Sequence, residues 1–266
     1  MRCSKWHALG NDYLLVEPAD LDIPLEPGFV RHLCDYHYGI GSDGILEVTS
    51  IDTARASVRI WNPDGSLAEL SGNGTRIVAA WLARRSATRH VRVVVGTREA
   101  AADLDEAGEV TVDLGSVDVG AFEILEVDGE RIELTPVSVG NPHAVVRREP
   151  ERGELRRLGP LIERHQRFPD RTNVQLVRVD SRHDLTVRVW ERGAGETLSS
   201  GTSAVAAAAA AVAHNWCESP VRVHLPGGEL LVELGGNDHA RLTGPAEEIC
   251  RIELVQPSRV SAPPPM

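Results

Sequence analysis

Two short segments of the chain carry the same polar pattern, and each directly precedes an apolar run with helical spacing. Residues 69–75 form the first segment and residues 196–202 the second, with a serine followed by a glycine in each. A helix N-terminus exposes unpaired backbone N–H groups and a partial positive charge, which together favour a bound carboxylate. The predicted chemistry is a carboxylate gripped by two helix starts, with Ser71 and Ser200 on opposite sides of the ligand. That geometry suits removal of a proton from one face of an α-carbon and delivery to the other.

A second shared pattern lies upstream of each helix start, where a Gly-Asn pair follows an aliphatic residue. Asn11 precedes Ser71 by 60 residues, and Asn141 precedes Ser200 by 59. Two motifs at nearly equal offsets are hard to obtain by chance. They predict two structurally equivalent halves with a site between them.

The residues after each serine supply the candidate backbone donors, namely Gly72, Asn73, Gly201 and Thr202. Further polar residues fall at predicted turns and strand ends: Asn11, Asn62, Asn141, Asn173, Glu191 and Arg192. A purely structural role stays open for both serines, because serine is among the preferred N-cap residues. The arginine next to Glu191 could likewise bind a carboxylate or pair with its neighbour.

The composition argues against several classes of protein. The chain has 266 residues and a formal net charge of −11, which disfavours binding to nucleic acid. No stretch reaches the roughly 18 apolar residues of a membrane span, and the N-terminus lacks the apolar core of a signal peptide, so we expect no membrane partner and a cytoplasmic location. Lys5 is the only lysine, and a pyridoxal-phosphate enzyme would need it for its Schiff base.

Cysteine and histidine spacing predicts neither a metal site nor a disulfide framework. The four cysteines show no Cys-x-x-Cys pair and the ten histidines no His-x-x-x-His pair. All four cysteines, at positions 3, 34, 217 and 250, are predicted to be small buried side chains.

The apolar periodicity predicts a mostly β chain with a long helix embedded in each half. Expected helices cover residues 29–37, 75–85, 154–165 and 202–214. Expected strands cover two runs within residues 3–17, then 56–61, 173–179, 185–190, 221–225, 229–234 and 240–243, with an antiparallel meander over residues 90–125. The alanine run 206–211 suits a helix packed inside a sheet or barrel. The tail, residues 257–266, is expected to be loose.

Six motifs of the chain resemble those of diaminopimelate epimerases, and they follow the family's order over almost the whole chain. They lie in residues 5–12, 39–44, 62–66, 140–143, 168–173 and 191–197. The resemblance implies an α/β fold of the α+β type with two pseudo-symmetric halves, residues 1–125 and 126–256, which can exchange closing strands. Each half would be a β-barrel-like sheet around a central helix, with the ligand in a cleft between the halves.

The resemblance also implies an activity and a set of site residues. The activity is cofactor-independent inversion of LL-diaminopimelate to the meso form in lysine biosynthesis, by a homodimer that needs no metal. The family's substrate-binding asparagines fall on Asn11, Asn62, Asn141 and Asn173. The helix-start amides would hold the reacting carboxylate, and Asn62, Asn173, Glu191 and Arg192 would read the far end of the ligand. His143 is the third candidate catalytic residue, in a supporting position.

The chain departs from the family at the two positions that matter most, because the family's acid and base cysteines fall on Ser71 and Ser200. A helix start can lower a thiol pKa to roughly 3.5–7.5, whereas a serine hydroxyl needs a neighbouring base. Three alternatives stay open: an epimerase with both cysteines deliberately replaced, a natural serine-bearing relative that epimerises slowly or uses carboxylates or His143 in the proton transfers, and an amino-acid-binding protein that has lost catalysis. A phenazine-type isomerase would use Glu69 or Glu196 as its carboxylate.

Overall fold

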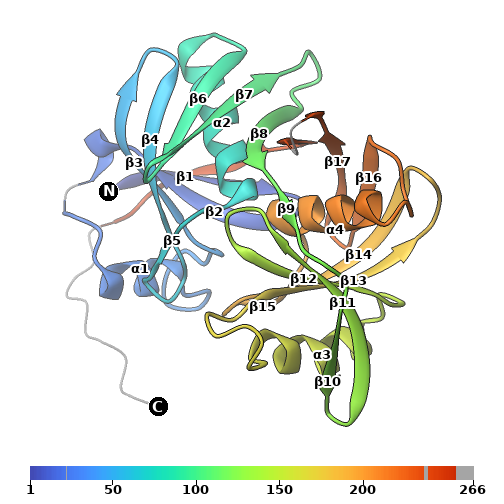
Figure 1. Ribbon diagram of the computed structural model, residues 1–266. Helices are drawn as coiled ribbons and strands as arrows, with labels where there is room; N and C mark the ends of the chain where they lie inside the picture. The colour runs from blue at the N-terminus through green and yellow to red at the C-terminus, as the bar shows by residue number, and fades with distance from the viewer. Residues whose placement is uncertain (22, 237–238, 256–266) are drawn as a thin grey trace.

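The computed structural model describes residues 1–21, 23–236 and 239–255 (Figure 1). The predicted loose tail, residues 257–266, lies outside the described residues. The first set of elements comprises β1 (Arg2–Ala8), β2 (Asn11–Val16), the short 3₁₀ helix η1 (Pro18–Asp20), α1 (Pro27–Cys34), β3 (Ile45–Asp52), β4 (Arg55–Trp61), β5 (Leu67–Ala68), α2 (Gly72–Ser86), β6 (His90–Val95), β7 (Arg98–Leu104), β8 (Val110–Ser116) and β9 (Asp118–Val119).

The second set opens with the hairpin of β10 (Glu123–Val127) and β11 (Glu130–Ser138). It continues with β12 (Pro142–Arg147), α3 (Arg152–Glu163), β13 (Asn173–Val179), β14 (Asp184–Glu191), β15 (Gly195–Thr197), α4 (Gly201–Ala213), β16 (Val221–Leu225), β17 (Gly228–Leu234), β18 (His239–Gly244) and β19 (Glu247–Glu253). The predicted boundary after residue 125 falls inside β10.

The two sets repeat the same strand pairings. β2 runs parallel to β3 and β12 runs parallel to β13, with α1 and α3 as the respective connections. In the same way β4 pairs in parallel with β6 across α2, and β14 pairs in parallel with β16 across α4. Parallel neighbours need a long crossover connection, so this topology ties each long helix to the strands on both sides of it.

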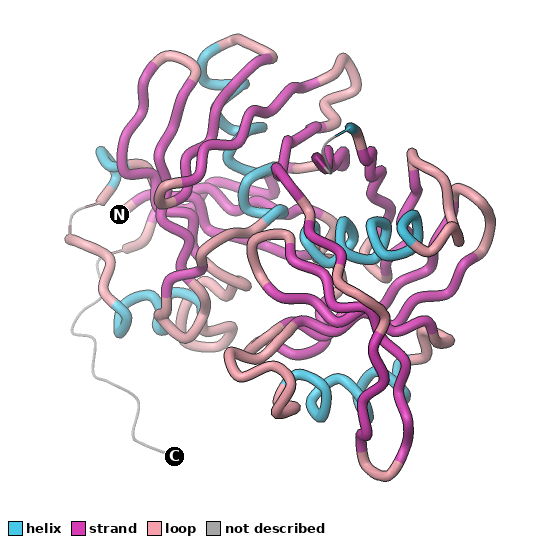
Figure 2. Tube along the Cα trace, viewed as in Figure 1, coloured by secondary structure: helices cyan, strands magenta, loops and turns pink. Residues whose placement is uncertain are grey.

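The helices α2 and α4 form the interior of their halves, and Figure 2 shows strands around each of them. α2 contacts β1, β2, β4 and β6 to β8, whereas α4 contacts β9, β11 to β14 and β16 to β18. All residues from Ala204 to Ala211 are buried. Their small side chains let the surrounding strands approach the helix backbone closely, which confirms the interpretation of the alanine run.

The last strands of each set pair with the other set. β19 is antiparallel to β1, and β18 pairs with β8 as well as with β17. β9 pairs in turn with β11. These pairings link the two sets in three places, and the side chains around α2 and α4 belong to one continuous apolar core.

The predicted fold class is confirmed, and most predicted elements are found, with differences that have local causes. The first helix ends at Cys34 rather than at residue 37, because the Asp35 carboxylate accepts the N–H groups of His37 and Tyr38, each at 2.7 Å. The prediction omitted six strands, namely β3, β5, β11, β12, β15 and β19. α2 begins three residues earlier than predicted, at Gly72.

One cysteine prediction is wrong. Cys3, Cys34 and Cys217 are buried as expected, but Cys250 is exposed, because it lies on β19, most of whose side chains face outward. Among the described residues, no helix is both long and apolar enough to cross a bilayer.

Candidate active site

The N-terminus of α2 meets the N-terminus of α4 where the two halves join (Figure 1). A Cβ atom built on Gly72 would lie 3.1 Å from the Cα atom of Gly201, and a Cβ atom on Gly201 would lie 3.1 Å from the Cα atom of Gly72. Only glycine permits so close an approach of two backbones. The junction therefore brings two sets of helix-start N–H groups together, with Ser71 and Ser200 as the flanking N-cap residues.

Ser71 is held by the backbone of its own helix. Its Oγ atom accepts a hydrogen bond from the N–H of Gly74 at 3.0 Å, which makes Ser71 a true N-cap. The phenol oxygen of Tyr13 lies 3.2 Å from the same Oγ atom. Burial raises the pKa of Tyr13 well above its usual value, so this phenol keeps its proton at neutral pH.

Ser200 has a different partner. Among the described residues its side chain makes no cap hydrogen bond, and its Oγ instead donates to Oε2 of Glu191 at 3.3 Å. Burial raises the pKa of Glu191 above its usual 4.5, and the hydroxyls of Thr197 and Ser200 offset only part of that rise. A serine hydroxyl next to a carboxylate of raised pKa is an arrangement that can accept and pass on a proton.

The two Gly-Asn motifs contact equivalent points of the two helices. Asn73 donates to Oδ1 of Asn11 at 3.0 Å, and Asn141 donates to Oγ1 of Thr202 at 3.5 Å. Asn73 and Thr202 are both the second residue of their helix. Asn11 also donates to Oδ2 of Asp43 at 2.9 Å. The predicted equivalence of the motifs therefore extends to their hydrogen bonds.

His143 contacts Asn141 and takes part in neither of the hydrogen bonds described for Ser71 and Ser200. Its side chain is 1% exposed, its Nε2 atom lies 2.9 Å from Oδ1 of Asn141, and its Nδ1 atom lies 3.0 Å from the amide of Gln175. Burial, assisted by the charge of Arg192, lowers the pKa of His143 to about 3. The ring is therefore neutral near pH 7, and the geometry suits it to orient Asn141.

The residues expected to read the far end of a ligand are only partly connected to one another. Asn173 accepts the backbone N–H of Arg192 at 2.9 Å and donates to the carbonyl of Pro142. Asn62 instead donates to Ser66 within its own turn. Glu191, which was grouped with them, lies against Ser200 at the helix junction.

Sequence reasoning missed two residues of the junction. Arg76 is fully buried inside α2, where it donates to Oδ1 of Asn73 at 2.9 Å, and its Nε atom has no partner among the described residues. The Arg76 side chain also reaches Gly201. A Cβ atom built on Gly201 would lie 3.2 Å from Nη1 of Arg76. An arginine directly before the apolar run 77–83 was a signal available in the sequence. Tyr13, which follows a recognised motif directly, is the second.

The carboxylates considered for a phenazine-type reaction lie elsewhere. Glu196 accepts hydrogen bonds from Arg152 and Arg156, at 2.9 Å each, on the surface beside α3. Glu69 is exposed. Glu191 is therefore the glutamate that contacts a helix-start serine.

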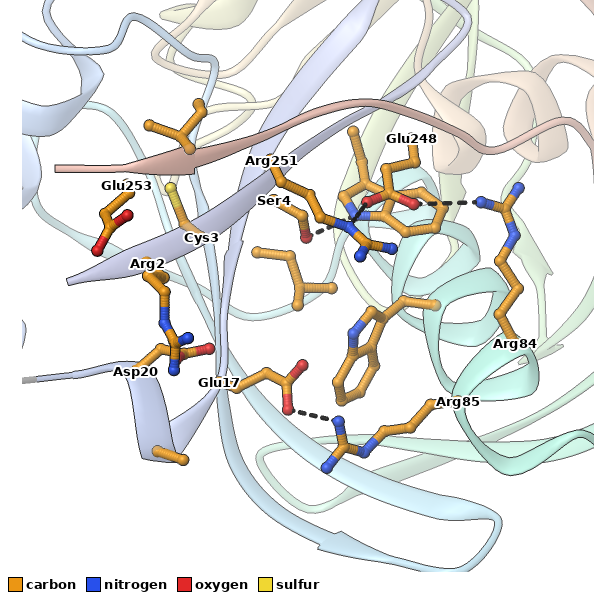
Figure 3. A pocket seen from close by; sticks show the side chains of 15 residues that line it. Arg2, Cys3, Ser4, Glu17, Asp20, Arg84, Arg85, Glu248, Arg251 and Glu253 are labelled. Atoms are coloured by element: carbon orange, nitrogen blue, oxygen red, sulfur yellow. Dashed lines mark hydrogen bonds and ion pairs between the residues drawn. The ribbon is translucent and has the colours of Figure 1, made fainter.

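A hollow of about 820 Å³ lies apart from these residues, at the outer end of α2 (Figure 3). Most of its charged side chains pair with one another, as Arg85 does with Glu17 and Arg84 with Glu248. Because these charges are already matched, the hollow offers less to a charged ligand than the helix junction does.

Comparisons with known proteins point to one family. A family model described as diaminopimelate epimerase matches residues 3–119 and 135–249. The chain is 37% identical to a diaminopimelate epimerase of Desulfitobacterium hafniense, over 96% of this chain and 99% of that protein. It is 40% identical to one of Azotobacter vinelandii, over 94% and 97% respectively.

Solved structures share the fold at low identity. A predicted epimerase from Pseudomonas aeruginosa superimposes with a TM-score of 0.74 at 18% identity, covering 96% of this chain and 99% of that one. A hydroxyproline epimerase from Agrobacterium vitis, with bound trans-4-hydroxy-L-proline, gives 0.70 at 17% identity, covering 95% and 91%. A phenazine biosynthesis protein of the PhzF family from Bacillus anthracis gives 0.70 at 14% identity, covering 96% and 99%.

Proposed function

The chain belongs to the diaminopimelate epimerase family, and we propose that it inverts one α-carbon of LL-diaminopimelate to give the meso form, with Ser71 and Ser200 at the positions of the acid and base. That it is an amino-acid epimerase follows from the family. The substrate, the site residues and the serine chemistry are our proposal. Following the family pattern, we also propose a cytoplasmic homodimer that acts in lysine biosynthesis.

The observation that carries this proposal is the contact between the two helix starts. Gly72 and Gly201 touch, each follows a serine, and the fully buried Arg76 lies directly behind them. Removal of an α-proton spreads negative charge onto the substrate carboxylate. Helix-start N–H groups and a desolvated guanidinium stabilise that charge where it develops.

Proton removal is assigned to the Ser200 face. The α-proton passes to Oγ of Ser200 while the proton of that hydroxyl passes to the carboxylate of Glu191, 3.3 Å away. The electron pair of the broken C–H bond stays on the substrate and is shared with its carboxylate. The raised pKa of Glu191 brings it closer to the working pH, which favours this transfer.

Proton delivery is assigned to the opposite face. Ser71 gives its hydroxyl proton to the α-carbon, and the oxyanion left behind accepts the Gly74 N–H at the positive end of α2. Asn11 and Asn141 orient the reacting end, with His143 holding Asn141. Asn62, Asn173 and Arg192 are assigned to the distal amino-acid group.

The test is exchange of the α-proton with solvent deuterium. Purified protein is incubated with LL-diaminopimelate in D₂O, and NMR follows both loss of the α-proton signal and appearance of the meso isomer. We expect slow exchange and inversion in the unmodified protein, loss of both in Ser200→Ala, and no change in Ser86→Ala at the far end of α2. Calorimetric binding with no exchange would instead indicate a ligand-binding protein, and the absence of binding would reject the proposed substrate.

A further inference from the structure

The phenol of Tyr13 reaches the helix junction from β2. Tyr13 is 8% exposed, and its hydroxyl lies 3.2 Å from Oγ of Ser71. Its ring occupies space that exists because residue 44 is glycine, since a Cβ atom on Gly44 would lie 2.7 Å from the ring atom Cε1. The position of the phenol is therefore fixed by close packing.

The hydrogen-bond capacity of Ser71 decides the direction of this contact. A serine hydroxyl has one donor hydrogen and two acceptor lone pairs. One lone pair accepts the Gly74 N–H. Burial raises the pKa of Tyr13, so its hydroxyl keeps its hydrogen. Among the described residues Ser71 is the hydrogen-bond partner of that hydroxyl, so the buried phenol satisfies its hydrogen by donating to the second lone pair of Ser71. The hydrogen of Ser71 is then free to point at a ligand.

We propose that Tyr13 is the proton-supplying partner of Ser71, a positioning residue that acts on the substrate through that serine. The inference rests on the proposed function, which it deepens. It assigns the two faces different chemistry, with a glutamate behind Ser200 for proton removal and a phenol behind Ser71 for proton delivery.

The proton transfers balance as follows. The C–H bond on the Ser200 face breaks, and one proton ends on the carboxylate of Glu191. On the other face the O–H bond of Ser71 breaks as a new C–H bond forms, and the O–H proton of Tyr13 replaces the one that Ser71 gave up. Negative charge has moved from Glu191 to Tyr13. Proton exchange with water after product release restores the starting form.

Charge coupling between the two faces supports this sequence. The carboxylates of Glu191, Asp43 and Asp12 add to burial in raising the pKa of Tyr13. Once Glu191 takes up the substrate proton, it no longer contributes to that rise. The phenol therefore becomes a stronger acid at the step in which Ser71 must deliver a proton.

The first test is a graded change of phenol acidity. Tyr13→Phe keeps the ring against Gly44, and it should lower kcat about 100-fold with little change in KM, as loss of a general acid does. Tyr38→Phe, on an exposed ring, is the matched control and should leave kcat unchanged. Fluorinated tyrosines placed at position 13 should change kcat progressively with phenol acidity. A flat kcat across that series, or full activity in Tyr13→Phe, would overturn the proposal.

The second test does not depend on epimerisation. In Ser71→Cys the introduced thiol is alkylated at a series of pH values, and mass spectrometry of the peptide containing position 71 separates it from the native cysteines. Adding Tyr13→Phe should raise that thiol's pKa by about one unit, because a hydrogen bond to the thiolate is lost. An unchanged pKa would reject the donor role of Tyr13. A shifted pKa in a protein without any epimerase activity would reject the proposed function and leave the Tyr13 contact in place.

Discussion

The N-termini of α2 and α4 have similar backbone arrangements, but their serines have different hydrogen-bond partners. At the first, Ser71 caps its own helix and contacts a phenol. At the second, the Ser200 hydroxyl donates to a partly buried carboxylate, that of Glu191. The repeat therefore preserved the helix position and the glycine contact, while the groups that handle protons diverged. Similar folds on both sides of a site do not imply similar chemistry on both sides.

The Gly-Asn motifs show the same divergence. Asn11 is oriented by the carboxylate of Asp43, whereas Asn141 is oriented by the buried, neutral ring of His143. Burial raises the pKa of Asp43 and lowers that of His143 to about 3. In both cases desolvation favours the uncharged form of the supporting group.

The largest expected effect comes from making the two helix starts chemically alike. Replacing both serines in Ser71→Cys with Ser200→Cys should raise kcat for epimerisation by about 10²–10⁴-fold, the usual contribution of an effective general acid–base group. A helix start lowers a thiol pKa into the working range, so each cysteine can serve without a strong neighbouring base. Polarimetry or chiral chromatography of diaminopimelate measures the gain. A double variant no faster than the unmodified protein would argue against proton transfer at these positions.

The second largest expected effect concerns the carboxylate of Glu191, which acts on the Ser200 face and not on the Tyr13 face. Glu191→Gln should lower kcat about 100-fold, because Ser200 loses the group that takes its proton.

The same change, Glu191→Gln, should stabilise the fold at neutral pH. The folded-state pKa of Glu191 is raised above 4.5, so its contribution to stability is fully present below about pH 4 and is lost as pH rises through the folded-state pKa.

Thermal denaturation at pH 4 and pH 7 checks the predicted direction of this change in stability. Glu191→Gln should exceed the unmodified protein in Tm by about 2–4 °C at pH 7, if desolvating the charge costs about 1 kcal/mol, and by little at pH 4. Glu196→Gln is the control, since Glu196 is paired with Arg152 and Arg156 and gains nothing from neutralisation. Equal Tm values for Glu191→Gln at both pH values would contradict a desolvated charge.

The positions of the two helix starts could be predicted from the sequence, but the partners of their serines could not. Duplicated Ser-Gly and Gly-Asn motifs at matching offsets identified the two helix starts, and a family resemblance supplied the fold. The partners of the serines were not predictable, because Tyr13 reaches Ser71 only through the packing of β2 on Gly44. Glu191 was recognised as a site residue and grouped with Arg192, but its hydrogen bond with Ser200 depends on the tertiary fold and has no signal in the sequence.

Two of the strands that were not predicted, β3 and β19, escaped prediction for physical reasons. β3 begins with four consecutive buried residues and lacks the alternation that marks a half-buried strand. β19 has no buried side chain, so it shows no apolar periodicity and is defined by its pairing with β1. α2 starts early for a related reason, because Gly72 and Gly74 are poor helix formers that tertiary contacts hold in the helix.

The smallest expected effect tests the contact on which both faces depend. In Gly72→Ala the new Cβ would lie 3.1–3.4 Å from backbone atoms of Gly201 and Thr202, so one helix start must shift. We expect a loss of about 1 kcal/mol in the free energy of unfolding, at the lower end of the cost of overpacking, and weaker binding of diaminopimelate. Gly153→Ala is the matched control, because a Cβ on this glycine of α3 has open space. It should gain up to about 1 kcal/mol from helix propensity. Urea denaturation with calorimetric binding separates the two outcomes, and a Gly72→Ala variant that behaves like Gly153→Ala would show that the helix starts need not touch.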